Sequence, residues 1–293
     1  MIAAQAEAAP GRERPATRPR FRPHALPGFG LTLGLASTYL SLMVLAPLIA
    51  LCLKAMGLGW GGFLEQVTGP RALASYRVTM GSALAATAFN AVFGLLLAWI
   101  LVRYRFVGRR LLDAAIDLPF ALPTSVAGIA LVTLLAPNGW LGRPLAALGV
   151  AVVYTPLGIT LAMAFTSLPF IVRALQPALA ELETEVEEAA VSLGASSGAV
   201  MRRIIAPALA APLASGCATA FGRGLGEYGA VIFIAGNLPR KTEVTALLAY
   251  IRLEEFDYPA AAALSMMLMV AGGSIMLLSN VFQFSRARRV TGS

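Results

Sequence analysis

The sequence predicts an all-α integral membrane protein with about six transmembrane helices, and three observations support that fold class. Of the 293 residues, 58% are hydrophobic and only 13% are charged, whereas soluble domains carry about 25% charged residues. The mean hydropathy is +0.74. The charged residues are gathered in short clusters between long apolar runs, and a helix needs about 20 apolar residues to cross a bilayer.

Six apolar runs follow one another along the chain. Five are long enough to span a bilayer and carry almost no charge, namely 31–53, 78–102, 114–136, 150–172 and 258–281. The remaining run, 208–234, contains Arg223, Glu227 and several glycines, so we expect an irregular span there. Pro119 and Pro123 are expected to break the third run. No internal repeat is visible, which argues against a solenoid.

Composition divides the chain into three parts. Residues 1–28 are rich in Pro and Arg and are expected to form a disordered basic cytoplasmic tail that touches anionic membrane lipid. Residues 29–285 form the membrane domain, in which 173–207 is a polar cytoplasmic insert. Residues 286–293 are expected to form a second basic cytoplasmic tail. No small-residue cleavage site follows the first apolar run, so that run is expected to stay as an uncleaved anchor.

Lys and Arg are distributed unequally over the two sides of the membrane. One side carries Arg12, Arg14, Arg18, Arg20, Arg22, Arg103, Arg105, Arg109, Arg110, Arg173, Arg202, Arg203, Arg286, Arg288 and Arg289. The other side carries fewer, namely Lys54, Arg71, Arg77, Arg143, Arg240, Lys241 and Arg252. Because cytoplasmic loops are enriched in Lys and Arg, both termini and the insert are predicted to be cytoplasmic. The formal charge of +8 is explained by this bias and implies no nucleic-acid partner.

The residues needed for nucleotide, metal or redox chemistry are missing from the sequence. A phosphate-binding loop requires a glycine before its lysine, and Arg240 occupies that position before Lys241-Thr242. Cys52 and Cys217 lie in apolar runs and are expected to be small core residues, and a single His cannot form a zinc or haem site. The chain is therefore predicted to be no enzyme, with no catalytic residues, no metal site and no bound cofactor.

The polar insert is expected to fold as a helix, a glycine turn and a second helix. Gly194 can adopt the positive φ that ends the first helix, and Ser196 or Ser197 can cap the second. Pro207 then opens the following span. Helical spacing places Glu181, Glu185 and Glu188 on one face and Glu183 and Glu187 on another. From spacing alone, a solvated charged helix and a docking helix remain equally open.

The insert resembles the cytoplasmic loop of ABC-importer permeases, the EAA motif, with the pattern E-A-A, three residues, G, nine residues, I-x-L-P. The chain matches at Glu188, Ala189, Ala190, Gly194, Ile204 and Pro207, and it departs at Ala206, where the pattern has leucine. The resemblance implies a coupling helix that sits in a groove of an ATPase. The coupling residues are then expected to be Glu187, Glu188, Ala189, Ala190, Gly194, Ala195 and Pro207.

Further segments resemble the T-type permease subunits of sulfate/thiosulfate ABC importers, over about residues 30–285. They are Leu118–Gly128, Phe165–Arg173, Leu225–Asn237, Lys241–Val244 and Leu253–Pro259. The resemblance implies a type I ABC importer permease fold in a bacterial inner membrane, and anion import. It also implies a second permease subunit, expected to be the W-type sister chain, two ATPase subunits that hold ATP and Mg, and a periplasmic sulfate/thiosulfate-binding protein. Molybdate or another tetrahedral oxyanion remains an alternative substrate.

Arg223 and Glu227 lie four residues apart, on one face of the irregular span. Charges inside a bilayer face a partner or a water-filled path, so two interpretations stay open. The pair is either a structural ion pair or part of a polar lining for a divalent anion. The candidate translocation path comprises Arg223, Glu227, Tyr228, Asn237, Thr124 and Ser125.

Two other function classes are an intramembrane enzyme and an ion-coupled carrier. An intramembrane enzyme would have to use Asp113, Asp117, Arg223 and Glu227, but no nucleophile–base set accompanies them. The two aspartates are instead expected to cap helix starts, with Asp117 as the cap in the third run. An ion-coupled carrier would use Glu227 as a proton site, but it would have no use for the acidic cytoplasmic helix.

Overall fold

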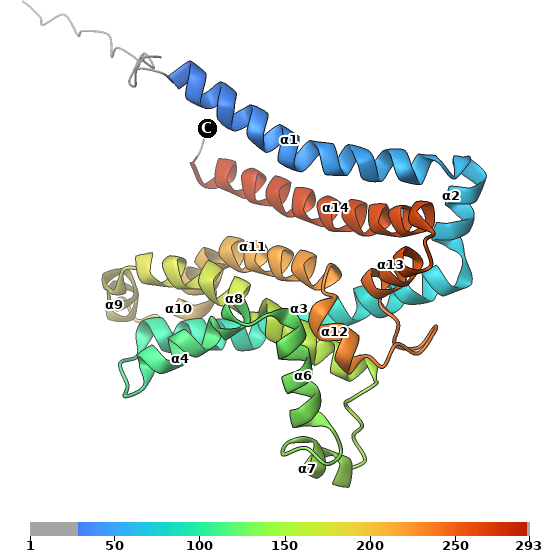
Figure 1. Cartoon of the computed structure of the whole chain (residues 1–293). Coiled ribbons are helices and arrows are strands. Elements are labelled where there is room, and N and C mark those ends of the chain that lie inside the picture. The colour runs from blue at the N-terminus through green and yellow to red at the C-terminus, as the bar shows by residue number, and fades with distance from the viewer. Residues whose placement is uncertain (1–28, 292–293) are drawn as a thin grey trace, which may run out of the picture. The chain divides into compact units, whose positions relative to one another are not determined.

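The computed structural model describes residues 29–291, without the side chains of 280 and 282–291. All of its regular elements are helices within that range (Figure 1). The first helix, α1 (Phe29–Met56), covers the predicted span 31–53. Of the described residues, those up to Leu48 belong to one compact unit and those from Ile49 onward to another. The predicted tail 1–28 lies outside the described residues.

The second unit contains the remaining helices. In chain order they are α2 (Gly59–Thr68), α3 (Pro70–Arg103), α4 (Arg109–Ile116), α5 (Leu118–Ala121), α6 (Thr124–Leu135), α7 (Gly142–Ala147), α8 (Pro156–Glu181), α9 (Thr184–Ser192), α10 (Ser197–Val200), a π-helix (Met201–Ile205), α11 (Ala206–Leu225), α12 (Gly229–Ile234), α13 (Thr245–Glu254) and α14 (Tyr258–Thr291). Within residues 29–291, five helical segments are long and apolar enough to cross a membrane: α1, α3, α8, the continuous run 197–225, and α14.

The third predicted span is not one helix. It is divided into α4, α5 and the 12-residue α6, so the predicted break at the prolines is confirmed. Leu122 is extended because a residue that precedes proline is disfavoured in the helical region. At 1.5 Å per residue, α6 is about 18 Å long and cannot cross a core of about 30 Å alone.

The irregular span is confirmed and is also divided in two. Its first part, α11, ends at Leu225, and its second part, α12, begins at Gly229. The short parts of the two broken spans pack on each other, because α12 contacts α6. A Cβ on Gly128 would lie 2.5 Å from the Ala230 carbonyl oxygen. Only glycine permits this close approach.

Helix α8 is the centre of the core, packed between α3 and α11. Ile171 is fully buried, and glycines on both neighbours make room for it, since a Cβ on Gly94 or Gly216 would lie within 3.0 Å of it. Small residues at such seams let membrane helices approach closely. Asn90 Nδ2 donates to the Ala164 carbonyl oxygen at 2.8 Å and thereby joins α3 to α8.

Both predicted limits of the fourth span, 150–172, are displaced. The helix begins at Pro156, where Thr155 caps it by accepting from the Gly158 amide at 3.4 Å. It continues to Glu181, so the first residues of the predicted insert 173–207 are helical. At the end of the chain, α14 continues to Thr291 through most of the predicted tail 286–293, and residues 292–293 lie outside the described range.

Candidate functional site

The EAA segment folds as the sequence predicts, with a helix closed by a glycine turn. Gly194 has φ +86°. The Ala195 amide donates to the Ala190 carbonyl at 3.0 Å, and the Gly194 amide donates to the Val191 carbonyl at 2.9 Å. These two bonds form a Schellman motif, and both alanines pack against the same apolar cluster, as that motif favours. The turn is therefore fixed by local interactions.

The second helix of the insert differs from the prediction at its end. Ser196 caps it as expected by accepting from the Ala199 amide at 3.4 Å, and Pro207 lies in the first turn of α11 as expected, but no turn separates the two helices. The chain stays helical from 197 to 225 through a π-helical turn in which the Ala206 amide donates to the Met201 carbonyl. Proline has no amide hydrogen and displaces the carbonyl four residues earlier, and the wider π turn accommodates this.

Helix α9 exposes most of its surface, and none of its residues is buried. Glu188, Ala189 and Gly194 are exposed, whereas Ala190 and Ala195 are partly buried against the core. The expectation missed the apolar members of this surface: Leu193 is 89% exposed and Val191 is 56% exposed. The apolar side chains that lie next to Gly194 in an otherwise polar insert are the sequence signal that could have indicated them.

The glutamates of the insert are not arranged on two faces of one helix. Glu181 ends α8, and Leu182 and Glu183 are extended before α9 begins, so the expected face of Glu181, Glu185 and Glu188 is wrong. Glu187 instead points to the body of the protein, where it forms an ion pair with Arg103 at the end of α3. The Arg103 guanidinium also lies 5.4 Å from the centre of the Trp99 ring, a cation–π distance.

The break between α11 and α12 is organised by Glu227, which is 1% exposed. Its Oε1 accepts from the Ala230 amide at 3.0 Å and so caps α12. Its Oε2 lies 2.8 Å from Arg223 Nη1, yet it has no hydrogen-bond partner among the described residues. The pair is therefore held by charge, and the carboxylate is needed for the architecture. This geometry gives Glu227 a structural role that a proton carrier would disturb.

The structure brings five of the six predicted path residues into one region. Arg223, Glu227 and Tyr228 surround the break, and Thr124 and Ser125 adjoin it, since a Cβ on Gly229 would lie 2.0 Å from Thr124 Oγ1. Asn237 does not join them because it follows the far end of α12. There it has φ 48°, and its Oδ1 is buried without a hydrogen-bond partner in the described part of the chain.

Asp117 stands at the N-cap position of α5, as expected, but its side chain makes no capping hydrogen bond, and Asp113 lies inside α4. Both carboxylates bind Arg173 of α8: Nη1 donates to Asp113 Oδ1 at 2.7 Å, and Nε donates to Asp117 Oδ1 at 3.0 Å. A hydrogen bond from Gln176, followed by that from Arg173, lowers the pKa of Asp113 below its ordinary value. These contacts attach α8 to α4 and to the start of α5 through charge-assisted hydrogen bonds.

Another ion pair, which the sequence did not reveal, lies at the start of α3, and its carboxylate is buried. Arg71 donates to Glu243 from Nη2 at 2.6 Å and from Nε at 2.9 Å, and Glu243 is 1% exposed. Close by, the Thr245 amide donates to Thr79 Oγ1 at 2.8 Å. The segment 237–245 is thereby attached to α3 by a bidentate pair, the strong form of such contacts.

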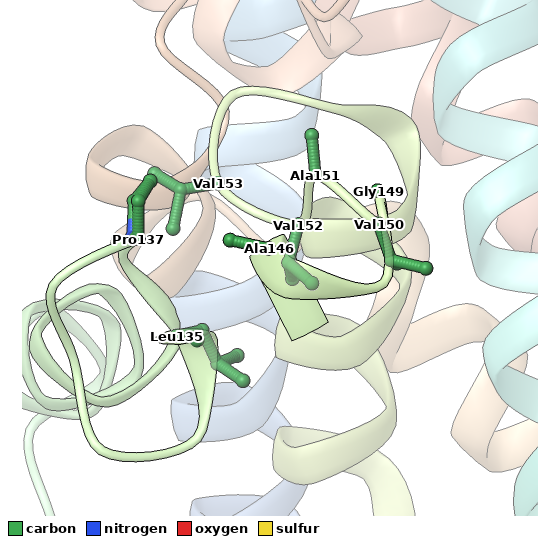
Figure 2. Close-up of a pocket in the computed structure, with 9 residues that line it drawn as sticks. Leu135, Pro137, Ala146, Gly149, Val150, Ala151, Val152 and Val153 are labelled. Carbon is green, nitrogen blue, oxygen red and sulfur yellow. The ribbon is translucent and has the colours of Figure 1, made fainter. Parts of the chain in front are cut away.

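A small cavity of about 210 Å³ lies between α6, α7 and the loop 149–153. Figure 2 shows Leu135, Pro137 and Val152 among the side chains that surround it. All of its side chains are apolar. It therefore offers neither a charge nor a side-chain hydrogen-bond donor to an oxyanion.

Comparison with protein families matches residues 90–292 to the model described as "Binding-protein-dependent transport system inner membrane component". Among curated proteins, the chain is 50% identical over 267 residues to the "Sulfate transport system permease protein CysT" of Salmonella typhimurium, covering 91% of this chain and 96% of that protein. The protein of the same name from Escherichia coli gives the same values, and that of Synechocystis is 47% identical over 84% of this chain and 86% of its own.

Solved structures give the fold. The chain resembles a protein in the "Crystal structure of a bacterial ABC transporter involved in the import of the acidic polysaccharide alginate", with TM-score 0.70, 19% identity, and 88% and 96% of the two chains covered. A second alginate transporter structure, in complex with a periplasmic protein, gives TM-score 0.71 at 19% identity, over 90% and 96% of the chains. These neighbours confirm the type I ABC importer permease fold.

Proposed function

The chain belongs to the family of binding-protein-dependent transport system inner membrane components, and from that premise we propose that it is the permease subunit of an ATP-driven sulfate importer. The observation that carries the proposal is the identity of 50% to sulfate transport permeases over 91% of the chain. The protein is a multi-pass membrane protein. It is no enzyme itself, and ATP hydrolysis takes place on a separate subunit.

We place the ATPase contact at α9 and its turn. Glu188, Val191 and Leu193 are exposed there and offer an acidic and apolar surface, a combination that suits a groove with apolar walls and a basic rim. ATP and Mg belong to the partner ATPase subunits. The other partners in this proposal are a second permease, the W-type sister chain, and a periplasmic binding protein that delivers sulfate or thiosulfate.

The orientation is proposed from the distribution of charge, with both termini and α9 in the cytoplasm. Two ion pairs agree with this arrangement, because each joins segments assigned to the same side. Arg103 binds Glu187 at the assigned cytoplasmic side, and Arg71 binds Glu243 at the assigned periplasmic side.

The translocation path is proposed to pass the break between α11 and α12. Arg223 is 35% exposed, so its guanidinium can meet a divalent anion while Glu227 holds it in place. Tyr228, Thr124 and Ser125 offer hydroxyl groups around the same break, and Asn237 would contribute an amide at the periplasmic end of α12. Hydroxyls and amides bind a tetrahedral oxyanion without adding charge.

Uptake of labelled sulfate tests the proposal in a bacterial strain that lacks this chain and carries it on a plasmid. We expect uptake only with the plasmid, reduced by excess unlabelled thiosulfate. Uptake of sulfate that does not depend on the chain would contradict the proposal. Stronger competition by molybdate than by thiosulfate would assign the alternative substrate.

A further inference from the structure

Helix α9 is held to the protein by few contacts. None of its residues is buried, and a groove of about 690 Å³ lies beneath it, lined by Trp99, Glu187, Val191 and Met201 among others. Ala190 and the following Ala195 rest on the core. Packing alone therefore leaves α9 free to shift relative to the body of the protein.

One ion pair joins α9 to α3 beside this groove. Arg103, the last residue of α3, donates to the Glu187 carboxylate, and the two side chains are 15% and 21% exposed. Among the residues that the structure describes, it is the only ion pair that α9 forms. The neighbouring Glu188 is exposed, so the two consecutive glutamates, about 100° apart around the helix, point in different directions from α9.

At its other end, α3 carries the ion pair between Arg71 and Glu243, whose carboxylate is buried. The 34-residue helix is about 50 Å long at 1.5 Å per residue. Ser75 and Thr79 add contacts to Thr245 at 3.2 and 3.1 Å. One continuous helix thus connects the underside of α9 to the segment 237–245, which follows α12 and leads into α13.

We propose that α3 transmits displacement of α9 to the segment 237–245 through these two ion pairs. The pairs Arg103–Glu187 and Arg71–Glu243 are positioning contacts, which link events at the ATPase surface to the far side of the membrane. A helix under axial load is stiff along its hydrogen-bonded axis. Helix α9 is joined to α8 only by the short extended piece Leu182–Glu183 and to α10 by the Gly194 turn. This inference rests on the proposed function.

The test uses the complete importer in vesicles, with labelled sulfate uptake and ATP hydrolysis measured on the same preparation. Arg103→Gln, Glu187→Gln and Arg71→Gln should each lower the sulfate transported per ATP about fivefold, the scale of coupling between contacting side chains. The ATPase subunits should stay bound. The matched controls are Arg105→Gln and Glu181→Gln, which remove exposed charges from the segments that follow α3 and precede α9 and should leave the ratio unchanged.

Two double variants make the test specific. Arg103→Glu with Glu187→Arg should restore the ratio to within about twofold of the unmodified importer. Arg103→Gln combined with Arg71→Gln should lower the ratio no further than either single variant does. Effects at sites this far apart normally add, but here either change interrupts the same connection through α3.

Several outcomes would overturn the inference. These are an unchanged ratio in the single variants, loss of the ATPase subunits on changing Glu187, additive effects at the two ends of α3, or failure of the charge swap to restore either abundance or coupling. Failure of the proposed function is seen separately, because the unmodified importer would then show no ATP-dependent sulfate uptake.

Discussion

Glu227 caps α12 through one carboxylate oxygen and faces Arg223 at 2.8 Å through the other. The two interactions make different demands on the side chain. The cap needs only an acceptor, whereas the contact with Arg223 needs a negative charge. A neutral acceptor at this position can therefore separate the architectural role of the break from its electrostatic role.

Glu227→Gln should retain the cap, and Glu227→Ala should lose it. We expect the alanine variant to be less stable than the glutamine variant by about 1–2 kcal/mol, the value of a lost helix cap. Thermal unfolding of the purified protein in detergent measures the difference. Equal stability of the two variants would show that the Ala230 amide needs no acceptor.

The charge swap Arg223→Glu with Glu227→Arg should restore the ion pair but not the cap, because arginine has no acceptor. We therefore expect partial recovery of membrane abundance over the single variants and poor sulfate uptake. Quantitative blots and labelled uptake give the two values. Full recovery of both would make the pair purely structural and remove Arg223 from the proposed path.

Gly194→Val should impair coupling through backbone strain alone. An added Cβ meets nothing within 4 Å, but φ is +86°, which costs a β-branched residue about 1–2 kcal/mol. Gly194→Asn should be tolerated. Gly198→Val is the matched control, since Gly198 also has open space but no positive φ. Two quantities are measured: the amount of ATPase that stays bound during purification, and the sulfate taken up per ATP hydrolysed. Equal behaviour of the two valine variants would contradict the role of the turn.

Gly128→Ala should force α6 and α12 apart, because its Cβ would lie 2.5 Å from the Ala230 carbonyl. Overpacking of this kind costs about 1–3 kcal/mol, and sulfate uptake should fall with the loss of thermal stability. Gly222→Ala, which meets nothing within 4 Å, serves as the control. If Gly128→Ala behaves as this control does, the seam between the two short helices is not closely packed in the membrane.

Reporter fusions test the orientation. Fusions after Arg110 and after Ser196 should report cytoplasm, and fusions near Gly69 and Gly142 should report periplasm, as the distribution of Lys and Arg predicts. A periplasmic signal at Ser196 would place α9 out of reach of a cytoplasmic ATPase and contradict the coupling assignment.

Local sequence signals predicted the local structure well. Hydropathy identified the spans, and Gly194 and Ser196 marked the turn and cap of the insert, because each acts within a few residues of the chain. The end of α8 was misplaced because Arg173 looked like a boundary. Its partners, Asp113 and Asp117, lie 60 and 56 residues away, so no local pattern reveals that its charge is neutralised.

The same limit applies to the candidate site. Glu187 and Glu188 are alike in sequence, and only the position of Arg103, 84 residues before Glu187, turns one inward and leaves the other exposed. The break at 226–228 was visible from glycine and charge, but the packing of α12 on α6 depends on tertiary contacts between Gly128 and Ala230. The spacing of Arg223 and Glu227 alone could not show that Glu227 both faces Arg223 and caps α12.

ATP-dependent accumulation of labelled sulfate tests the central claim most directly. The complete importer is placed in vesicles with ATP inside and the loaded binding protein outside. We predict that sulfate accumulates against its gradient and that accumulation stops when ATP is replaced by a non-hydrolysable analogue. Equal sulfate uptake with the analogue, or uptake driven by a proton gradient without ATP, would contradict the assignment of this chain as the permease of an ATP-driven sulfate importer.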